Sequence, residues 1–414
     1  MFFNRRIPSF MREAYYYESL GAITFALFVG LSASFFPIIA RKLGASSFQM
    51  ALLSSAPFMG ALFTLYWARL SSNAVSQMGF FVKVKLLARG VILFTFLAIN
   101  PWIFILLVFL NSLLEQAGSP AYAGIVKKIY SDDYRGRAMG YVRMEMAIVA
   151  VFASYLGGFL LDHFSYRYIF PLGAVFGVLS IIYFGRIKVK KENTRRQRKK
   201  QGILPREILE VFKKDRPFAL FEMIFFVRGF ANLMVMPLFP IFLVDYLGIS
   251  NTSMGKLISL SSVFLISSYL FWGHYIDKKG SCRSLTVSFF LASFIPLCYS
   301  FASSIWYIVP ASIIAGFTLG AGELARIHFI TNRAKSEDVP TYQGIDFTLI
   351  GLTGITAPFL GAGLMHWIGI ESVFIISFCL SIISSLVMFL SNRYYFSPVV
   401  FGKKARRQKN VALD

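Results

Sequence analysis

Long apolar runs follow one another along almost the whole chain and are separated by short polar segments. A helix that crosses the hydrocarbon core of a bilayer needs about 20 mostly apolar residues, and the runs reach roughly this length. The pattern therefore predicts an all-α integral membrane protein with twelve spanning helices. We expect these helices near residues 18–40, 47–70, 82–99, 102–126, 138–161, 166–186, 218–244, 251–276, 284–301, 305–330, 344–367 and 371–392.

The overall composition supports this prediction. Of the 414 residues, 56% are hydrophobic, 15% are charged and 45 are phenylalanine. Soluble domains carry about 25% charged residues, so this chain has more apolar surface than a soluble core of its length can bury. We therefore expect a multi-pass protein of a cell membrane, either a plasma membrane or a bacterial inner membrane.

The net charge of +22, taken alone, is typical of a protein that binds nucleic acid. The basic residues outside the apolar runs, however, lie mainly in alternate gaps, and the exceptions are Arg41, Lys42 and Arg167. Loops that stay in the cytoplasm carry an excess of Lys and Arg, so this distribution places both termini in the cytoplasm. It also argues against a nucleic-acid partner.

The longest polar segment, residues 187–217, divides the chain near its midpoint and is rich in Lys and Arg. It predicts a six-helix bundle in residues 1–186, a basic cytoplasmic linker, a second six-helix bundle in residues 218–392 and a basic cytoplasmic tail in residues 393–414. A solvated linker is the simpler interpretation. Binding of membrane lipids with anionic headgroups is the alternative.

The two predicted bundles share an internal repeat at a shift of about 204 residues. The matching pairs are Glu18 and Glu222, Phe36 and Phe239, Gly44 and Gly248, Ser46 and Ser250, Trp67 and Trp272, and Phe170 and Phe374. No single match is persuasive, but a nearly constant shift across six helices predicts two halves of similar structure.

One polar loop of the second half carries a motif formed by Gly273, Asp277, Lys278, Gly280 and Arg283. It resembles the motif G-x-x-x-D-[RK]-x-G-x-[RK]-[RK] of the major facilitator superfamily (MFS), which lies between helices two and three and is often echoed between helices eight and nine. The resemblance implies two parallel six-helix bundles that rock about a central site, which is called alternating access. It also implies that Asp277 is a latch at the cytoplasmic side and not a substrate ligand.

The same family places Gly and Pro on helix five and on its counterpart, helix eleven. Here helix eleven contains Pro358 and Gly361, whereas helix five keeps only Gly157 and Gly158 of the pattern. Small residues let helices approach closely, and Pro introduces a bend. The family associates the helix-five pattern with export, so its erosion leaves efflux and nutrient uptake equally open.

Six polar residues within the predicted spans are candidates for function, because ionisable groups are costly there. They are Asn111 and Glu115 on helix four, Arg228 and Asn232 on helix seven, and Glu323 and Arg326 on helix ten. The resemblance implies that helices one, four, seven and ten line the central site. We therefore expect these residues to bind substrate or protons.

Structural pairing is the alternative role for the charged members of this set. Glu115 would then pair with Arg228 across the two halves, and Glu323 would pair with Arg326 along one helix. A further charge, Arg89 on helix three, is expected to snorkel toward the cytoplasmic face because that helix should be peripheral.

The expected function is secondary active transport of a small organic solute by a monomer, with proton coupling as one option. An intramembrane enzyme and a receptor that does not transport are the alternatives. An enzyme needs a metal or an acid–base cluster, but the four His residues are scattered and no HExxH motif occurs. The chain also lacks a GxxxxGK[ST] loop for ATP. We expect no metal and no cofactor.

Overall fold

The computed structural model of the chain describes residues 7–189, 205–335 and 338–394, which fold into helices joined by short turns. The N-terminal half comprises η2 (Ser9–Met11), α1 (Arg12–Leu31), η3 (Ala33–Phe35), α2 (Phe36–Lys42), α3 (Ser47–Leu62), α4 (Thr64–Asn73), α5 (Gln77–Leu93), η4 (Phe94–Leu97), α6 (Pro101–Ala117), α7 (Ser119–Ile129), α8 (Asp132–His163) and α9 (Tyr166–Gly185). The C-terminal half comprises α10 (Pro205–Lys214), α11 (Arg216–Val235), α12 (Leu238–Ile241), η5 (Phe242–Tyr246), α13 (Asn251–Lys279), α14 (Ser281–Ser300), α15 (Ile305–Arg333), α16 (Val339–Ile368) and α17 (Ile370–Tyr394). Much of the predicted basic linker and nearly all of the predicted tail lie outside the described residues.

Ten helical segments within the described residues are long and apolar enough to cross a membrane. The pair α3 and α4, bent by 53°, makes an eleventh if the two helices form one span. Helix α5 has 17 residues, fewer than any of these ten segments, and contains Lys83, Lys85 and Arg89. The helical membrane architecture agrees with the prediction, whereas the count of twelve stays a prediction that depends on α3–α4 and α5.

The repeated sequence Leu-Gly-x-Ser forms the same turn in both halves. Gly44 and Gly248 have φ values of 88° and 55°, a region that residues with a Cβ rarely adopt. Two residues later, Ser46 and Ser250 accept hydrogen bonds from backbone N–H groups in the first turns of α3 and α13. The repeat therefore encodes the end of one helix and the start of the next.

Matching aromatic clusters stabilise each half. The rings of Phe36 and Phe170 meet edge to face with centroids 5.3 Å apart, and those of Phe239 and Phe374 stack at 5.6 Å. Phe36, Phe170 and Phe374 are buried and Phe239 is half-buried. Such pairs contribute about 0.5–1.5 kcal/mol beyond the burial of their area. These are two of the pairs that define the sequence repeat, so the repeat reflects shared packing.

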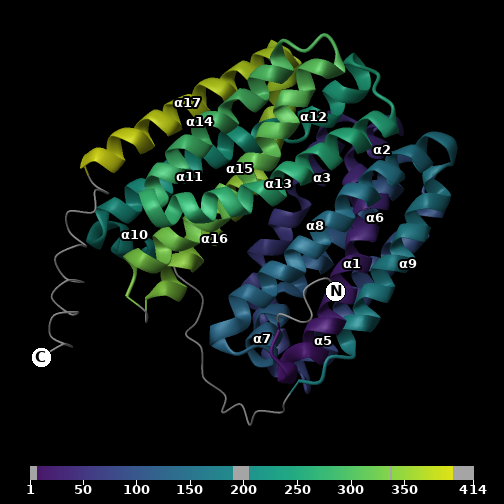
Figure 1. Cartoon of the computed structure of the whole chain (residues 1–414). Helices are drawn as coiled ribbons and strands as arrows, with labels where there is room; N and C mark the ends of the chain where they lie inside the picture. The colour runs from purple at the N-terminus through teal and green to yellow at the C-terminus, as the bar shows by residue number, and fades with distance from the viewer. Residues whose placement is uncertain (1–6, 190–204, 336–337, 395–414) are drawn as a thin grey trace, which may run out of the picture.

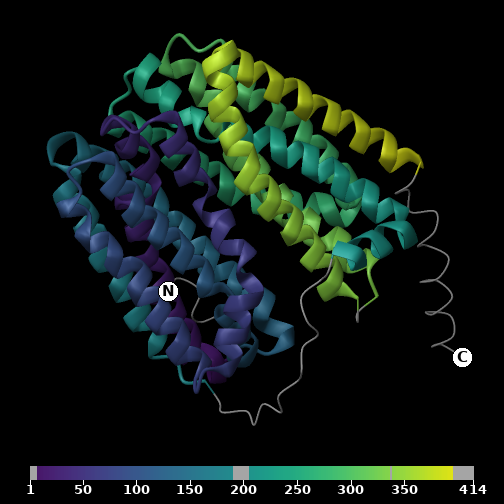
Figure 2. The ribbon, with the colours of Figure 1, turned by 180° about the vertical axis from the view of Figure 1, so that it is seen from behind.

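Figures 1 and 2 show the two halves side by side, close together at one end and diverging toward the other. We call the end where α9 finishes and α10 begins the linker end, and the opposite end, near α2 and α12, the far end. Between the halves, α8 packs on α13 and α3 packs on α16. These two helix pairs form the seams along which the halves meet.

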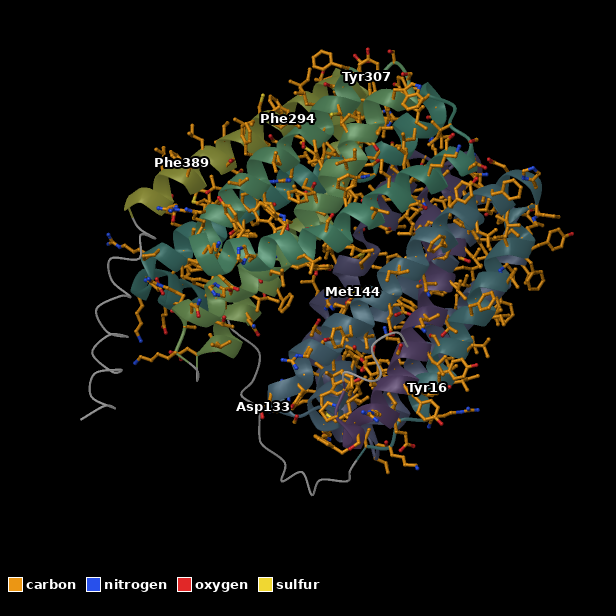
Figure 3. All side chains as sticks on the ribbon, viewed as in Figure 1. Tyr16, Asp133, Met144, Phe294, Tyr307 and Phe389 are labelled. Carbon is orange, nitrogen blue, oxygen red and sulfur yellow. The ribbon has the colours of Figure 1, made fainter. Side chains whose placement is uncertain are left out.

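The outer surface of the molecule carries many large apolar side chains. Figure 3 shows Phe389 on α17 and Tyr307 on α15 projecting from the ribbon, and they are 54% and 50% exposed. Apolar patches of this extent are rare on soluble monomers. A surface of this kind is suited to contact with the hydrocarbon chains of a bilayer.

Candidate functional site

Glu115 lies inside the N-terminal half, where it meets two cations. Its carboxylate pairs with Lys85, and Arg89 Nε donates to Glu115 Oε1 at 3.0 Å. Arg89 also donates to the Ser180 hydroxyl and to the backbone carbonyl of Gly177, the latter at 2.9 Å. The pairing of Glu115 with Arg228 considered from the sequence is therefore replaced by a network between α5, α6 and α9.

The expectation that Arg89 snorkels toward the cytoplasm is wrong. Its residue exposure is 5%, and its guanidinium lies 4.3 Å from the ring centroid of Phe25. Asn111, one turn before Glu115, donates to the backbone carbonyl of Ala88 at 2.8 Å. Sequence position alone could not reveal that the supposedly peripheral helix turns its charges inward.

Within the described residues, Arg228 and Asn232 form no hydrogen bond with each other. Arg228 lies with its guanidinium carbon 5.7 Å from the ring centroid of Phe289, and its buried Nε has no hydrogen-bond partner within the described residues. Asn232 is exposed. The structure therefore separates these two residues into a buried cation and an exposed amide.

Glu323 and Arg326 each find a partner on another helix, so the alternative in which they pair along α15 is wrong. Glu323 accepts hydrogen bonds from the hydroxyl of Tyr269 at 2.9 Å and from Arg143 Nη1 at 3.3 Å. Arg326 donates from Nε to Asp346 Oδ1 at 2.6 Å. Because Arg143 belongs to α8, the contact with Glu323 joins the two halves.

Glu18 and Glu145 form a second buried cluster, which the sequence analysis did not assign to the site. Tyr122 donates its hydroxyl to Glu18 at 2.7 Å, and Tyr130 donates to the other carboxylate oxygen. Tyr15 donates to Glu145 at 2.9 Å. Glu18 thus has hydroxyl donors and, among the described residues, no cationic partner.

Two further acids, Glu222 and Asp346, were also missed. The internal repeat contains a signal for the first, because Glu18 matches Glu222 at the shift that relates the halves. The same shift places Arg326 where Tyr122 stands in the N-terminal half. Asp346 has no such signal, since it lies close to the polar end of a predicted span.

The far end of α8 meets the first turn of α13. Asp162 accepts hydrogen bonds from the backbone N–H groups of Asn251 and Thr252, both at 2.8 Å. Asn251 in turn donates its side-chain amide to the carbonyl of Leu161 at 2.9 Å. The first N–H groups of a helix have no partner within it, and the helix dipole favours an anion there. An acid of one half therefore caps a helix of the other.

The second seam has an equivalent far-end contact with different chemistry. His366 Nε2 lies 2.7 Å from the hydroxyl of Ser47, the first residue of α3. The repeat relates His366 to Asp162 and Ser47 to Asn251, because each pair is separated by 204 positions. The two seams are thus closed at equivalent places by an imidazole in one case and a carboxylate in the other.

Charged residues add to these far-end contacts. Arg41 Nε donates to Asp245 Oδ2 at 2.9 Å, and Lys42 Nζ donates to the side chain of Asn251 at 2.8 Å. Each of these contacts joins the N-terminal half to the C-terminal half. Polar contacts between the halves are therefore concentrated at the far end.

The loop motif lies at the linker end, between α13 and α14. Gly280 ends α13 with φ at 83°, and the side chains of Asp277, Lys278 and Arg283 are exposed. Gly273 has open space around it. Within the described residues Asp277 has no ion-pair partner. In this state, with the far end closed, the motif is therefore an exposed turn between α13 and α14.

Gly157 and Gly361 occupy equivalent positions in close helix contacts. A Cβ at Gly157 would lie 2.3 Å from the carbonyl oxygen of Gly30, and one at Gly361 would lie 1.9 Å from that of Met234. Either distance is too short for a real side chain, so these contacts require glycine. Pro358 lies in the interior of α16, one turn before Gly361.

Gly158 performs a similar role between the halves. A Cβ at this position would lie 2.3 Å from the carbonyl oxygen of Asn251 and 3.1 Å from the Cα of Gly255. A Cβ at Gly255 would likewise lie 2.5 Å from the carbonyl oxygen of Ser154. The seam between α8 and α13 is thus a contact of backbone against backbone.

Asp215 holds three helices together at the linker end. It accepts from the N–H of Phe218 at 3.1 Å, from Arg333 Nη2 at 2.7 Å and from the hydroxyl of Tyr342 at 3.1 Å. Burial acts to raise the pKa of Asp215, but the hydrogen bonds from Arg333 and from Phe218 outweigh it and lower that pKa below its ordinary value. The carboxylate therefore stabilises the fold only while it is ionised.

We expect Asp215→Asn to lower the free energy of unfolding by about 2 kcal/mol at neutral pH. A carboxyl whose pKa is lowered in the folded state stabilises above its unfolded value of about 4, and this contribution is lost as the pH falls through the folded pKa. Thermal unfolding in detergent at several pH values between about 7 and 3 should therefore show the two proteins converge toward acid. A difference that stays constant with pH would contradict this role.

Two bundles of equivalent helices that meet along two seams define a membrane transporter fold. The sequence pattern of the Major Facilitator Superfamily matches residues 19–227 and again residues 221–409. The chain therefore belongs to the major facilitator superfamily. It is a transporter and not an enzyme.

Known relatives agree with this assignment. An uncharacterised transporter of Bacillus subtilis (strain 168), YwbF, is 30% identical over 170 residues, an alignment that spans 39% of this chain and only 41% of that relative. A mutant of the nucleoside transporter NupG superposes with a TM-score of 0.73 at 11% identity, covering 91% of this chain and 99% of its own. An inward-facing, occupied bacterial homologue of the human lysosomal transporter Spinster superposes with a TM-score of 0.64 at 15% identity. The superposition covers 93% of this chain and 97% of that structure. At these identities the two structures show a shared fold.

Proposed function

We propose that this protein is a secondary active transporter that moves a small organic solute by alternating access between its two halves. The observation that carries the proposal is the distribution of contacts between the halves. Asp162, Arg41 and His366 all make their contacts at the far end, while the helices diverge toward the linker end. A carrier in one of its two end states has this arrangement.

The orientation follows from the charges of the loops. With the linker end in the cytoplasm, as the excess of basic residues favours, the described state is open to the inside. We further propose twelve spans, with α3–α4 and α5 among them, a monomer in a cell membrane, and contacts of the basic linker with anionic lipids. Efflux and uptake are both compatible with this state.

The residues that we assign to the solute lie where α8 meets α15. Arg143 and Glu323, with side chains 55% and 43% exposed, pair across the halves, and Tyr269 adds a hydroxyl. A solute that enters from the linker end would compete with Arg143 for Glu323. Such competition suits a solute with a hydrogen-bond donor or a positive charge.

Proton coupling is part of the same proposal. Secondary active transport is driven by the gradient of a second species, for which a proton is one option, and buried acids without a matched cation are groups that exchange protons. Glu18 meets this requirement better than Glu115, because Glu115 faces both Lys85 and Arg89. We therefore move the proton role from Glu115 to the acids that the repeat relates, Glu18 and Glu222.

Counterflow in proteoliposomes tests the transport function. A thermal-shift screen first selects a solute that stabilises the protein, with nucleosides among the compounds because of the structural likeness to NupG. We expect preloaded liposomes to accumulate the labelled solute by exchange. A receptor would bind it without exchange, and that result would contradict the proposal.

Glu323→Gln should raise the solute concentration for half-maximal counterflow by about tenfold, which corresponds to the loss of one hydrogen bond to a charged group. Glu371→Gln is the matched control, because Glu371 is also an exposed acid of the C-terminal half, at the start of α17. Equal kinetics for both variants would remove Glu323 from the solute site.

A further inference from the structure

Three ionisable side chains meet in the interior of the C-terminal half, each from a different helix. Glu222 on α11 and Asp346 on α16 are 1% and 4% exposed, and Arg326 on α15 donates to Asp346 at 2.6 Å. Glu222 and Asp346 lie beside each other where α11 packs on α16, close enough for their carboxyl groups to interact. The cluster therefore contains two acids and one cation.

The remaining surroundings of this cluster are apolar. Phe225 lies under the guanidinium of Arg326, with the ring centroid 4.8 Å from Cζ. The neighbouring helices α13, α14 and α17 present Trp272, Leu285 and Met388 to this region. No other charged group acts on Glu222 among the described residues. The charge of the cluster must therefore be balanced by its own three members.

A hydrogen bond between two carboxyl groups requires a proton, because an ionised carboxylate is only an acceptor. Two adjacent carboxylates also repel each other strongly, so such pairs retain one proton. With Arg326 charged, one proton on the pair makes the cluster neutral. With none, a net negative charge is buried among apolar side chains, which is costly.

We propose that Glu222 and Asp346 share one exchangeable proton. This inference rests on the proposed proton-coupled transport, and it names the residues that hold the proton. Oε1 of Glu222, which has no hydrogen-bond partner within the described residues, is free to accept from Arg326 once the proton has left to water. Arg326, with 20% of its side chain exposed, is the member of the cluster with access to solvent.

The position of Asp346 connects this proton to the contact between the halves. Asp346 lies on α16, and further along the same helix Gly351 and Gly354 receive the side chains of Leu62 and Phe58 from α3. When Arg326 turns from Asp346 toward Glu222, the tie between α15 and α16 is released. Loss of the shared proton thus changes the contacts of α16, the helix that packs on α3 in one of the two seams.

The N-terminal half provides an internal comparison. There Tyr122 occupies the position equivalent to Arg326 and donates a neutral hydroxyl to Glu18. The scaffold thus repeats, but only the C-terminal cluster combines a carboxyl pair with a cation that can exchange partners.

Thermal unfolding of the purified full-length protein as a function of pH tests the inference without any solute. We expect the Tm of the wild type to fall as the pH rises above about 4, because the unfolded acids then lose their protons while the folded pair retains one. Glu222→Gln should remove this fall, because its amide is a permanent donor to Asp346 and mimics the protonated acid. Glu371→Gln should unfold like the wild type. Parallel curves for Glu222→Gln and the wild type would overturn the proposal.

Infrared spectroscopy of the wild type covers the case in which Glu222→Gln does not fold. The carbonyl stretch of a protonated carboxylic acid should be present at neutral pH and should disappear at alkaline pH. Its absence at neutral pH would overturn the proposal. Because neither experiment uses a solute, failure of counterflow would contradict the transport function and leave the shared proton intact.

Discussion

Glu115→Gln is expected to destabilise the protein by about 3–5 kcal/mol, because it leaves two buried cations without their acid. Lys85 and Arg89 have side chains that are 11% and 6% exposed, and both depend on Glu115 for charge balance. The measurement is thermal or denaturant unfolding of the purified protein. A change within about 1 kcal/mol would show that water already compensates these charges.

Lys85→Met is the matched variant, and we expect it to change the stability by less than about 1 kcal/mol. It leaves Arg89 and Glu115 as a balanced pair, and a methionine fills the same volume beside Gly118. The contrast between the two variants separates a loss of charge balance from a loss of packing. Equal destabilisation by both would favour packing. If Glu115→Gln destabilises the protein as expected, reduced transport by this variant would reflect its lower stability and not a proton role.

Gly158→Ala should prevent the far end from closing. Its methyl group would lie 2.3 Å from the carbonyl oxygen of Asn251, and neither backbone can move aside by changing a rotamer. We expect the population with a closed far end to decrease by at least about tenfold, equivalent to 1.4 kcal/mol. Gly363→Ala is the control, because no atom lies within 4 Å of the added methyl group.

Amide hydrogen exchange reports this change directly. The N–H groups of Asn251 and Thr252 lie in the first turn of α13 and are bonded only across the halves, to Asp162. Their protection therefore measures closure of the far end, since an open state exposes them to water. Gly158→Ala should remove this protection and Gly363→Ala should keep it. Unchanged protection in Gly158→Ala would show that α13 can shift to accept the methyl group.

Local signals in the sequence predicted the scaffold because each depends on neighbouring residues. The apolar runs predicted the helices. Gly44, Ser46, Gly248 and Ser250 entered only as matches of the repeat, and the structure shows that they form the turns between helices. The shift of about 204 residues predicted two similar halves, and the aromatic packing of Phe36 and Phe239 follows it.

Partners of the buried charges were harder to predict, because they depend on how each helix is rotated about its axis. Glu115 was expected to face the centre, but α6 turns it toward Lys85 on α5. Arg326 was paired with Glu323 by spacing, yet Asp346, 20 positions further along the chain, binds it. The match of Glu18 with Glu222 was the one sequence signal for the missed acids, and it was noted only as evidence for the repeat.

The two seams between the halves differ in mechanical stiffness. Along α8 and α13, Gly158 and Gly255 bring backbone against backbone, and backbone atoms have no alternative rotamers. Along α3 and α16, the side chains of Phe58 and Leu62 rest against glycines, and side chains can re-pack. We therefore expect the first seam to act as the axis of rotation and the second to slide. A solute released toward the linker end would leave beside α3 and α16, where the lower stiffness permits the larger movement.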